Sequence, residues 1–359
     1  MNYKIDTKSK KPAYLQLYEQ VKNDIIKEVY PYGTKLPSKR TVCAELNIST
    51  VTVEHSYALL CDEGYIEARE RSGYIVIFRS GDAYGVAVEE LPPIQHKSEA
   101  AEHPEFPISI LLKAMRRAME KSTAILEKSP NEGLYELKDA IRMYLMRNKG
   151  IHAESDQIII GSGAEYLYSL IIDLLGRDKL YGIESPSYEK IEQVYRLSDV
   201  NICMLPLSKD GIDSSSLFGS GADILHTTPY RSYPTGVTAS ASKRHEYIRW
   251  ASAKGRYTVE DDFESEFSVS SKPEETLFSL SENDNVIYMN TFSKTVSPAL
   301  RMGYMVIPKH LVKDFASKLG FLSCTVPTFE QMVLCELISS GDFERHINRV
   351  RRKKRKEIY

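Results

Sequence analysis

The chain has 359 residues, of which 42% are hydrophobic and 27% charged, and its formal net charge is −2. This length exceeds one ordinary hydrophobic core and indicates at least two domains, and the composition is that of a globular protein. The net charge excludes a polycation, so any nucleic-acid site must come from a local arrangement of charge.

The cysteines and the apolar segments indicate the cellular location and the kinds of site to expect. Five scattered cysteines without a C-x-x-C pair favour reduced thiols over a disulfide framework or a zinc site, so we expect no metal and a cytoplasmic location. The first residues contain no apolar segment typical of a signal peptide. No apolar run reaches the ~18 residues of a membrane span, and we expect no membrane partner.

Residues 1–78 show three helical patterns followed by two short strands, which predicts a helix-turn-helix with a wing. Ser38 and Ser49 stand where they would cap the second and third helices. The wing strands are expected at Tyr65–Ala68 and Gly73–Ile77. In such a unit the third helix enters the major groove of double-stranded DNA.

We expect the first residues of the third helix to face base edges and basic residues of the second helix and the wing to meet phosphates. The candidate DNA contacts are Lys39, Arg40, Ser49, Thr50, Thr52, Arg69 and Arg71. The alternative is a small helical bundle with an exposed hairpin. The first 80 residues carry a net charge of only about +2, so charge does not decide between them.

Four motifs in this region resemble the GntR-type winged helix along its whole length. They are Pro12–Tyr18, Gly33–Arg40, Asp62–Ile66 and Ser72–Tyr74. Family members usually place an arginine directly after the Ser or Thr that opens the recognition helix, whereas this chain has Thr50 there and Glu54 one turn later. The difference bears on the operator sequence and the affinity, and not on the fold.

Residues 79–105 lose both periodic patterns and contain paired prolines, which predicts a linker. In residues 106–359 helical patterns alternate with short apolar strands. This predicts an α/β domain with a mostly parallel sheet covered on both faces. The expected strands are Gln157–Ile160, Lys179–Ile183, Ile202–Leu205, Ile224–Thr227, Tyr257–Glu260, Val286–Asn290 and Gly303–Ile307.

Lys294 and Asp261 each follow one of these strands. A lysine just beyond a strand end, beside the hydroxyl of Ser293, suits Schiff-base formation with an aldehyde cofactor. Asp261 stands between Glu260 and Asp262 at such a strand end, and a buried carboxylate there suits a pyridinium nitrogen, which it holds protonated. The alternatives are a solvated loop lysine, and an acidic loop that binds a cation or nothing.

A phosphate site is predicted at Ser162, Gly163 and Ala164, where a strand, a glycine turn and a helix start follow one another. Ser293 and Arg301 can add a hydroxyl and a guanidinium to the same phosphate. Tyr188 offers a flat ring to stack on a cofactor. The alternatives are a tight connection for the glycines and core packing for the tyrosine.

In chain order, these motifs match the large domain of fold-type I aminotransferases. The matched residues are Asn131–Leu134, Ser162–Ala164, Pro186–Tyr188, Thr228–Pro229, Tyr233–Gly236, Glu260–Phe263, Ser293–Lys294 and Arg301–Gly303. Joined to a GntR-type winged helix, the chain resembles the MocR subfamily of regulators over nearly its whole length. The resemblance implies pyridoxal 5'-phosphate held as a Schiff base on Lys294, with Asp261 on its ring nitrogen and Arg301 on its phosphate. It also implies a head-to-tail homodimer.

Three features depart from the family pattern. Tyr233 stands where aminotransferases have an asparagine on the cofactor's phenolic oxygen, and Phe263 replaces a tyrosine that MocR relatives carry, so we expect a weaker electron sink. Family members continue for ~100 residues more. That segment holds a small subdomain and an arginine that binds a substrate carboxylate, so we expect this chain to be a fragment or a truncation. The basic run Arg351–Lys356 is interpreted as an exposed helix face and not as a nucleic-acid patch.

Three functions remain open at this stage. The first is a regulator that senses pyridoxal 5'-phosphate or a small amino-compound effector and binds a DNA operator. The second is a working aminotransferase with an appended DNA-binding domain, although we expect at most a slow half-reaction. The third is a DNA-binding protein whose aminotransferase part is only a dimerisation scaffold. Fold alone does not decide among them.

Overall fold

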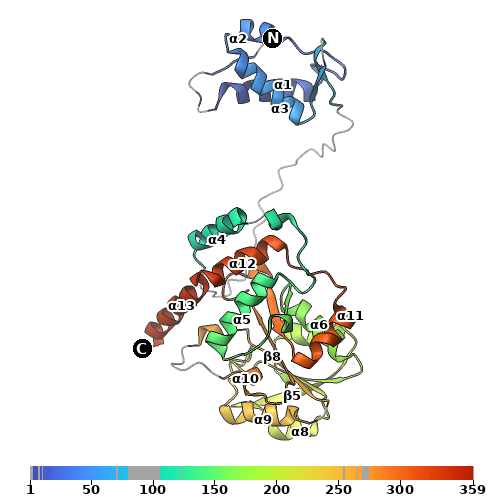
Figure 1. Cartoon of the computed structure of the whole chain (residues 1–359), viewed down its shortest axis with the longest axis vertical. Helices are drawn as coiled ribbons and strands as arrows, with labels where there is room; N and C mark the ends of the chain where they lie inside the picture. The colour runs from blue at the N-terminus through green and yellow to red at the C-terminus, as the bar shows by residue number, and fades with distance from the viewer. Residues whose placement is uncertain are drawn as a thin grey trace. The chain divides into compact units, whose positions relative to one another are not determined.

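The computed structural model describes residues 3–6, 9, 11–69, 72–79, 106–121, 123–253, 255–263, 265–268 and 275–358. It contains two compact units, Met1–Ser98 and Glu99–Tyr359, which are treated separately below (Figure 1). Arg71 and nearly all of the predicted linker, 79–105, lie outside the described residues, so both stay predictions.

The smaller unit has three helices and a two-stranded ribbon: α1 (Ala13–Ile26), α2 (Lys39–Leu46), α3 (Thr50–Asp62), β1 (Ile66–Arg69) and β2 (Gly73–Val76). The two strands pair antiparallel. The Ser38 hydroxyl caps α2 by accepting the Thr41 N–H at 3.2 Å. Asn47 ends α2 in the left-handed conformation, with φ 52°. The predicted helix-turn-helix and wing are confirmed.

One apolar core fixes these three helices against the ribbon. It consists of Leu17, Tyr18, Val21, Ile25, Leu36, Val42, Val53, Tyr57, Leu60, Ile66 and Val76. Tyr57 is buried on α3, and its hydroxyl donates to the Pro37 carbonyl at 3.0 Å, which ties α3 to the start of α2. The α2–α3 turn is therefore held rigidly by the core, as a DNA-reading unit requires.

The larger unit contains an eight-stranded sheet in the order β3-β10-β9-β8-β7-β4-β5-β6. The strands are β3 (Ile158–Gly161), β4 (Leu180–Ser185), β5 (Asn201–Ser208), β6 (Gly211–Ile212), β7 (Ile224–Thr227), β8 (Tyr257–Asp261), β9 (Val286–Thr291) and β10 (Gly303–Val306). The helices are α4 (Ile108–Lys121), α5 (Tyr135–Lys149), α6 (Ala164–Leu175), α7 (Glu189–Leu197), α8 (Ser214–Gly219), α9 (Ala241–Ala251), α10 (Leu277–Leu280), α11 (Val312–Leu319), α12 (Thr328–Ser339) and α13 (Asp342–Ile358). The predicted α/β class with a mostly parallel sheet is confirmed.

The strand directions bring distant parts of the chain to one edge. β5, β4, β7, β8 and β9 are parallel neighbours, and β10 is antiparallel to both β9 and β3. β3 consequently runs the same way as β9, and β10 begins at the edge where the parallel strands end. In open α/β sheets, ligands bind at this carboxyl edge.

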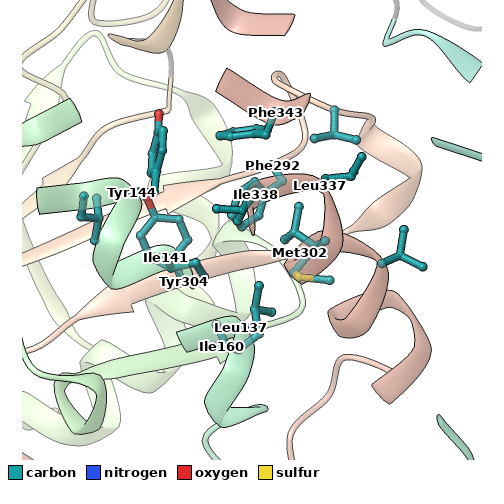
Figure 2. Close-up of a cluster of buried hydrophobic side chains, with 14 of the residues drawn as sticks. Leu137, Ile141, Tyr144, Ile160, Phe292, Met302, Tyr304, Leu337, Ile338 and Phe343 are labelled. Atoms are coloured by element: carbon teal, nitrogen blue, oxygen red, sulfur yellow. The ribbon is translucent and has the colours of Figure 1, made fainter. Parts of the chain in front are cut away.

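Side chains alternate between the two faces of the sheet, and each face carries its own core. Ile160, Tyr288 and Tyr304 belong to the core under α5, α12 and α13, whereas their neighbours Ile159 and Met289 belong to the core under α6, α7 and α11. Figure 2 shows part of the first core, with Leu137, Ile141, Tyr144, Ile160, Phe292, Met302, Tyr304, Leu337, Ile338 and Phe343. A third core packs α8, α9 and α10 against the sheet. This two-sided burial explains the continuous apolar strands.

The predicted strands all exist, with shifts at their ends. β3 starts one residue later than predicted because Gln157 belongs to a 3-10 turn at Ser155–Gln157, where Glu154 and Gln157 form a capping box. β5 extends to Ser208 because β6, which the sequence analysis missed, pairs with its end. Among the described helices, none combines the length and the apolar character that crossing a membrane requires.

Candidate functional site

The amino-terminal end of α3 presents a small, mostly polar surface. The Ser49 hydroxyl accepts the Thr52 N–H at 3.1 Å, so this residue caps the helix as predicted. Thr50 is exposed beside it. Val51, which the sequence analysis did not single out, is 61% exposed. An exposed valine next to threonine methyl groups suits apolar contact with thymine methyl groups in a major groove.

The basic residues predicted to meet phosphates differ in their surroundings. Lys39 forms a 2.7 Å ion pair with Glu54 of α3, and Arg69 pairs with Glu67 at 2.9 Å. Arg40 is exposed and has no ion pair among the described residues. A phosphate contact at Lys39 or Arg69 must therefore compete with a neighbouring carboxylate, whereas Arg40 needs no such exchange.

Most of the predicted cofactor residues follow or end strands of the large sheet, at its carboxyl edge. Ser162, Gly163 and Ala164 follow β3, Tyr188 follows β4, Asp261 ends β8, Ser293 and Lys294 follow β9, and Arg301 precedes β10. Tyr233 lies in the loop between β7 and α9. The topology thus brings together residues that are far apart in the sequence.

The turn from β3 into α6 lies beside Arg301 at this edge, and the cluster of Ser162, Gly163, Ala164 and Arg301 is called the cup below. Gly163 has φ +94°, which an L-residue with a side chain rarely adopts. The Ser162 N–H donates to the Thr325 hydroxyl at 3.1 Å. A Cβ added at Gly163 would lie 3.5 Å from Nη2 of Arg301, so the guanidinium stands directly beside the turn. The first N–H groups of α6 and this guanidinium suit an anion.

Glu165, which the sequence analysis missed, places a carboxylate in the same cup. Its Oε2 lies 3.1 Å from Nη2 of Arg301, and its Oε1 lies 2.9 Å from Nζ of Lys190. Burial acts to raise the pKa of this carboxyl, but Lys190, its own backbone N–H and Arg301 together hold the pKa below its ordinary value. The ionised carboxylate therefore joins the two cations.

Strand alternation separates Asp261 from its two acidic neighbours. Glu260 is fully buried on the opposite face, where it accepts the N–H groups of Leu277 and Phe278 at 2.8 and 2.9 Å. Asp262 forms a buried 2.8 Å ion pair with Lys149. Both neighbours are therefore occupied by partners within the protein, and the described residues contain no acidic, histidine and cysteine group suited to a metal.

Asp261 is buried and only half satisfied. The Tyr168 hydroxyl donates to Oδ2 at 2.6 Å, while Oδ1 has no hydrogen-bond partner among the described residues. His226 Nδ1 lies 2.9 Å from the Tyr195 hydroxyl, and its Nε2 lies 3.6 Å from Oδ2. An orphaned, buried carboxylate oxygen suits an N–H or N⁺–H donor from a ligand. The residues present therefore fit the protonated ring nitrogen of pyridoxal phosphate.

Lys294 is half-buried, and its Nζ lies 4.4 Å from the centre of the Phe263 ring. Tyr188 and Tyr233 form an edge-to-face pair with ring centres 6.1 Å apart, and they are 37% and 57% exposed. The core-packing alternative for Tyr188 is therefore wrong. Ser293 is half-buried beside the lysine.

Glu184 of β4 holds the loop that carries Tyr233 through hydrogen bonds. Its buried carboxylate accepts the Thr228 N–H at 3.1 Å, the Thr228 hydroxyl at 2.6 Å and the Ser232 hydroxyl at 2.7 Å. These charge-assisted bonds hold the loop rigidly next to the site. The backbone that leads into Tyr233 is thus held by the fold.

Comparison with known proteins supports both units. Residues 13–76 match the family model described as bacterial regulatory proteins, gntR family, and residues 100–357 match aminotransferase class I and II. The chain is 30% identical to the HTH-type transcriptional regulator YdeL of Bacillus subtilis over 96% of its own length and 77% of that protein. It is 28% identical to the HTH-type pyridoxine biosynthesis transcriptional regulator PdxR of Corynebacterium glutamicum, over 94% of this chain and 75% of PdxR. It is 25% identical to the probable rhizopine catabolism regulatory protein MocR of Rhizobium meliloti, over 97% and 76%.

Solved structures agree on the fold of the larger unit. Kynurenine aminotransferase of Pyrococcus horikoshii superposes with a TM-score of 0.63 at 27% identity, over 70% of this chain and 65% of that one. The α-aminoadipate aminotransferase LysN of Thermus thermophilus gives 0.61 at 26% identity, over 69% and 64%. The chain thus spans about three quarters of the regulators and under two thirds of these two enzymes.

Proposed function

Because this chain belongs to the MocR-type regulators, in which a GntR-type helix-turn-helix is joined to an aminotransferase class I and II domain, we propose that its larger unit senses pyridoxal 5'-phosphate, alone or combined with a small amino compound. The smaller unit binds an operator in double-stranded DNA through α2, α3 and the wing. Binding at the sheet edge changes the affinity for that operator.

The observation that carries the cofactor proposal is the half-satisfied Asp261. Its buried Oδ1 lacks a partner, although Tyr168 and the fold hold the carboxylate rigidly at the edge that also carries Lys294. Leaving a buried carboxylate oxygen without a hydrogen bond costs free energy. A bound ring nitrogen that donates to this oxygen removes that cost.

Each residue of the edge then has a defined role. Lys294 would supply a primary amine, Asp261 would accept a hydrogen bond from the protonated ring nitrogen, and Arg301 with the Ala164 N–H at the start of α6 would bind the phosphate, since the Gly163 N–H donates to the Gly161 carbonyl at 2.9 Å. Tyr188, whose ring is 37% exposed at this edge, would offer a flat surface to the ligand. When bound, pyridoxal 5'-phosphate supplies an aldehyde that condenses with primary amines. An amino compound would therefore compete with the Lys294 amine for this aldehyde.

Absorption spectroscopy tests the cofactor site. The protein mixed with pyridoxal 5'-phosphate should develop a visible band that borohydride bleaches, and Lys294→Ala should abolish this band. Lys313→Ala, which removes an exposed lysine from α11, is the matched control and should keep it. A band of equal intensity in Lys294→Ala would contradict the assignment.

The sensing step requires a difference in affinity between two states. A ligand shifts DNA binding only if it binds the DNA-competent state and the other state unequally. Operator titrations with and without pyridoxal 5'-phosphate, repeated with a panel of amino compounds, measure this coupling. Equal operator affinity under all conditions would contradict the sensing role and favour an aminotransferase unit that serves only as a dimerisation scaffold.

We also infer that the regulator is a homodimer, and α4 offers a surface that supports this. Ile108, Leu112 and Met119 share one helical face and are 71%, 45% and 65% exposed, whereas Ala114 and Ala118 on the other face are buried. Apolar side chains gathered on an exposed face are typical of an interface. Light scattering of the parent and of Leu112→Glu should give a dimer and a weakened dimer, and a monomeric parent would contradict the inference.

The likeness to kynurenine aminotransferase supports one competing function, a working aminotransferase. Rapid mixing with amino acids separates the two. Fast bleaching of the visible band with release of a keto acid, at a typical turnover of ~10 per second, would favour the enzyme. Slow or absent release would favour the regulator.

A further inference from the structure

Two cations and a helix start converge on the Glu165 carboxylate. Oε2 contacts Arg301 at 3.1 Å and Oε1 contacts Lys190 at 2.9 Å. Glu165 lies in the first turn of α6, a helix of 12 residues. This is the cup in which the proposed function places the phosphate of the cofactor.

The carboxylate lies inside the cup and not beside it. A Cβ built on Gly163 would be 3.6 Å from Oε2 of Glu165 and 3.5 Å from Nη2 of Arg301. The ion pair therefore spans the space directly over the glycine turn. A phosphate that approached the same N–H groups would meet the Glu165 carboxylate at close range, and two anions in contact repel each other.

We propose that Glu165 is a built-in anion of the phosphate cup, whose carboxylate competes with the cofactor phosphate for Arg301. On cofactor binding, Oε2 leaves Arg301, while Oε1 keeps its contact with Lys190. Glu165 thereby sets the affinity for the phosphate and not for the pyridine ring. This inference rests on the proposed function.

Lys190 makes the displacement possible. Its ammonium keeps one partner for the carboxylate after Arg301 has turned to the phosphate, so the negative charge of Glu165 is never left without a counter-ion. The hydrogen bond from Lys190 to Glu165, together with the negative charge of that carboxylate, holds the pKa of this lysine above its ordinary value. Lys190 thus remains charged in both arrangements.

The surroundings of the pair set the size of the effect. The side chains of Arg301, Glu165 and Lys190 are 59%, 28% and 49% exposed, so water screens the contacts in part. Partly exposed ion pairs change equilibria by small factors. Removing the charge at position 165 should therefore strengthen phosphate binding by about three- to tenfold.

Two probes isolate the phosphate. Pyridoxal 5'-phosphate and pyridoxal carry the same aldehyde and ring, but only the first carries a phosphate. In Glu165→Gln, the dissociation constant of pyridoxal 5'-phosphate, followed by the visible band, should fall by about three- to tenfold, and that of pyridoxal should stay within about twofold. Glu189→Gln, on the exposed first turn of α7, removes an equal charge and should change neither.

A third measurement is independent of Lys294. Inorganic phosphate should raise the melting temperature of cofactor-free Glu165→Gln more than that of the parent protein. Glu165→Ala repeats each comparison should the glutamine variant misfold. Unchanged affinity for pyridoxal 5'-phosphate, or an equal gain for pyridoxal, would overturn the role of Glu165 while leaving the cofactor site intact. Loss of the Lys294-dependent band in the parent would instead refute the proposed function, and the inorganic phosphate comparison would still decide whether Glu165 fills the cup.

Discussion

Replacing Tyr168 with phenylalanine tests how Asp261 is held. The Tyr168 hydroxyl donates to Oδ2 of Asp261 at 2.6 Å, and both side chains are buried. Burial, followed by the charge of Asp261, raises the pKa of Tyr168 well above its ordinary value, so the hydroxyl keeps its proton. Phenylalanine preserves the ring and its packing but removes the hydroxyl, and with it the hydrogen bond to Oδ2 of Asp261.

The magnitude follows from the type of bond. A buried hydrogen bond to a charged group contributes about 1.5–3 kcal/mol, and the loss leaves a second oxygen of Asp261 unsatisfied. The phenyl ring fills the same space, so a cavity adds little. We therefore expect the free energy of unfolding of the larger unit to fall by about 2 kcal/mol.

Urea unfolding followed by tryptophan fluorescence measures this loss. Trp250 is the only tryptophan of the sequence and is buried in the larger unit, so its signal reports on that unit alone. With a urea slope of about 3 kcal/mol per molar, the midpoint should fall by roughly 0.7 M. Tyr166→Phe on the same helix is the control, because the Tyr166 hydroxyl has no hydrogen-bond partner in the described part of the chain. Equal midpoints for the two variants would refute the reasoning.

Three further predictions address backbone, charge and DNA. Gly133 has φ +104°, and Gly133→Ala would place a Cβ 2.4 Å from Cγ1 of Ile160. We therefore expect the free energy of unfolding to fall by about 3 kcal/mol or more, and a urea midpoint equal to that of the parent would contradict this. Burial, followed by the charge of Asp262, raises the pKa of Glu260 to about 7; the folded state then binds its proton more tightly than the unfolded chain, so stability should fall by about 3 kcal/mol as pH rises from about 4.5 to 7. Glu260→Gln should lack this slope, and an identical pH profile would exclude Glu260 as its source. Arg40→Ala should weaken operator and nonspecific DNA alike and flatten the salt dependence in gel-shift titrations; an unchanged salt slope would argue against a phosphate contact there.

Local sequence signals predicted the parts of the fold that depend on neighbouring residues. The apolar runs of seven strands lie where β3, β4, β5, β7, β8, β9 and β10 occur, because strands buried on both faces leave a continuous apolar pattern. Ser38 and Ser49 cap helices as expected, because a cap depends on only four consecutive residues. The two-residue strand β6 escaped notice because it is too short to leave a pattern.

Contacts between segments that are distant in the sequence could not be predicted from such local signals. Tyr168 reaches Asp261 only because α6 packs on the face of β8 that Asp261 points to, and nothing near Tyr168 in the sequence marks that partner. Glu165 similarly meets Arg301 across 136 positions of the chain. The pairing of Lys39 with Glu54 arises from the angle between α2 and α3, which also depends on the tertiary core.

We propose that the chemistry of the edge favours binding over turnover. Asp261, Lys294 and the cup are the residues that we propose for a pyridine ring, an aldehyde and a phosphate, whereas the residue two positions after Asp261 is Phe263, which has no hydroxyl to offer a phenolic oxygen. The Phe263 ring instead lies 4.4 Å from Nζ of Lys294, and an aromatic face attracts the charged ammonium form of the amine. Because nucleophilic attack needs the neutral amine, we expect this contact to slow the attack of the free Lys294 amine on a bound aldehyde. We propose that slow exchange lengthens the lifetime of each ligand-bound state, which gives the regulator time to bind or release its operator before the ligand changes.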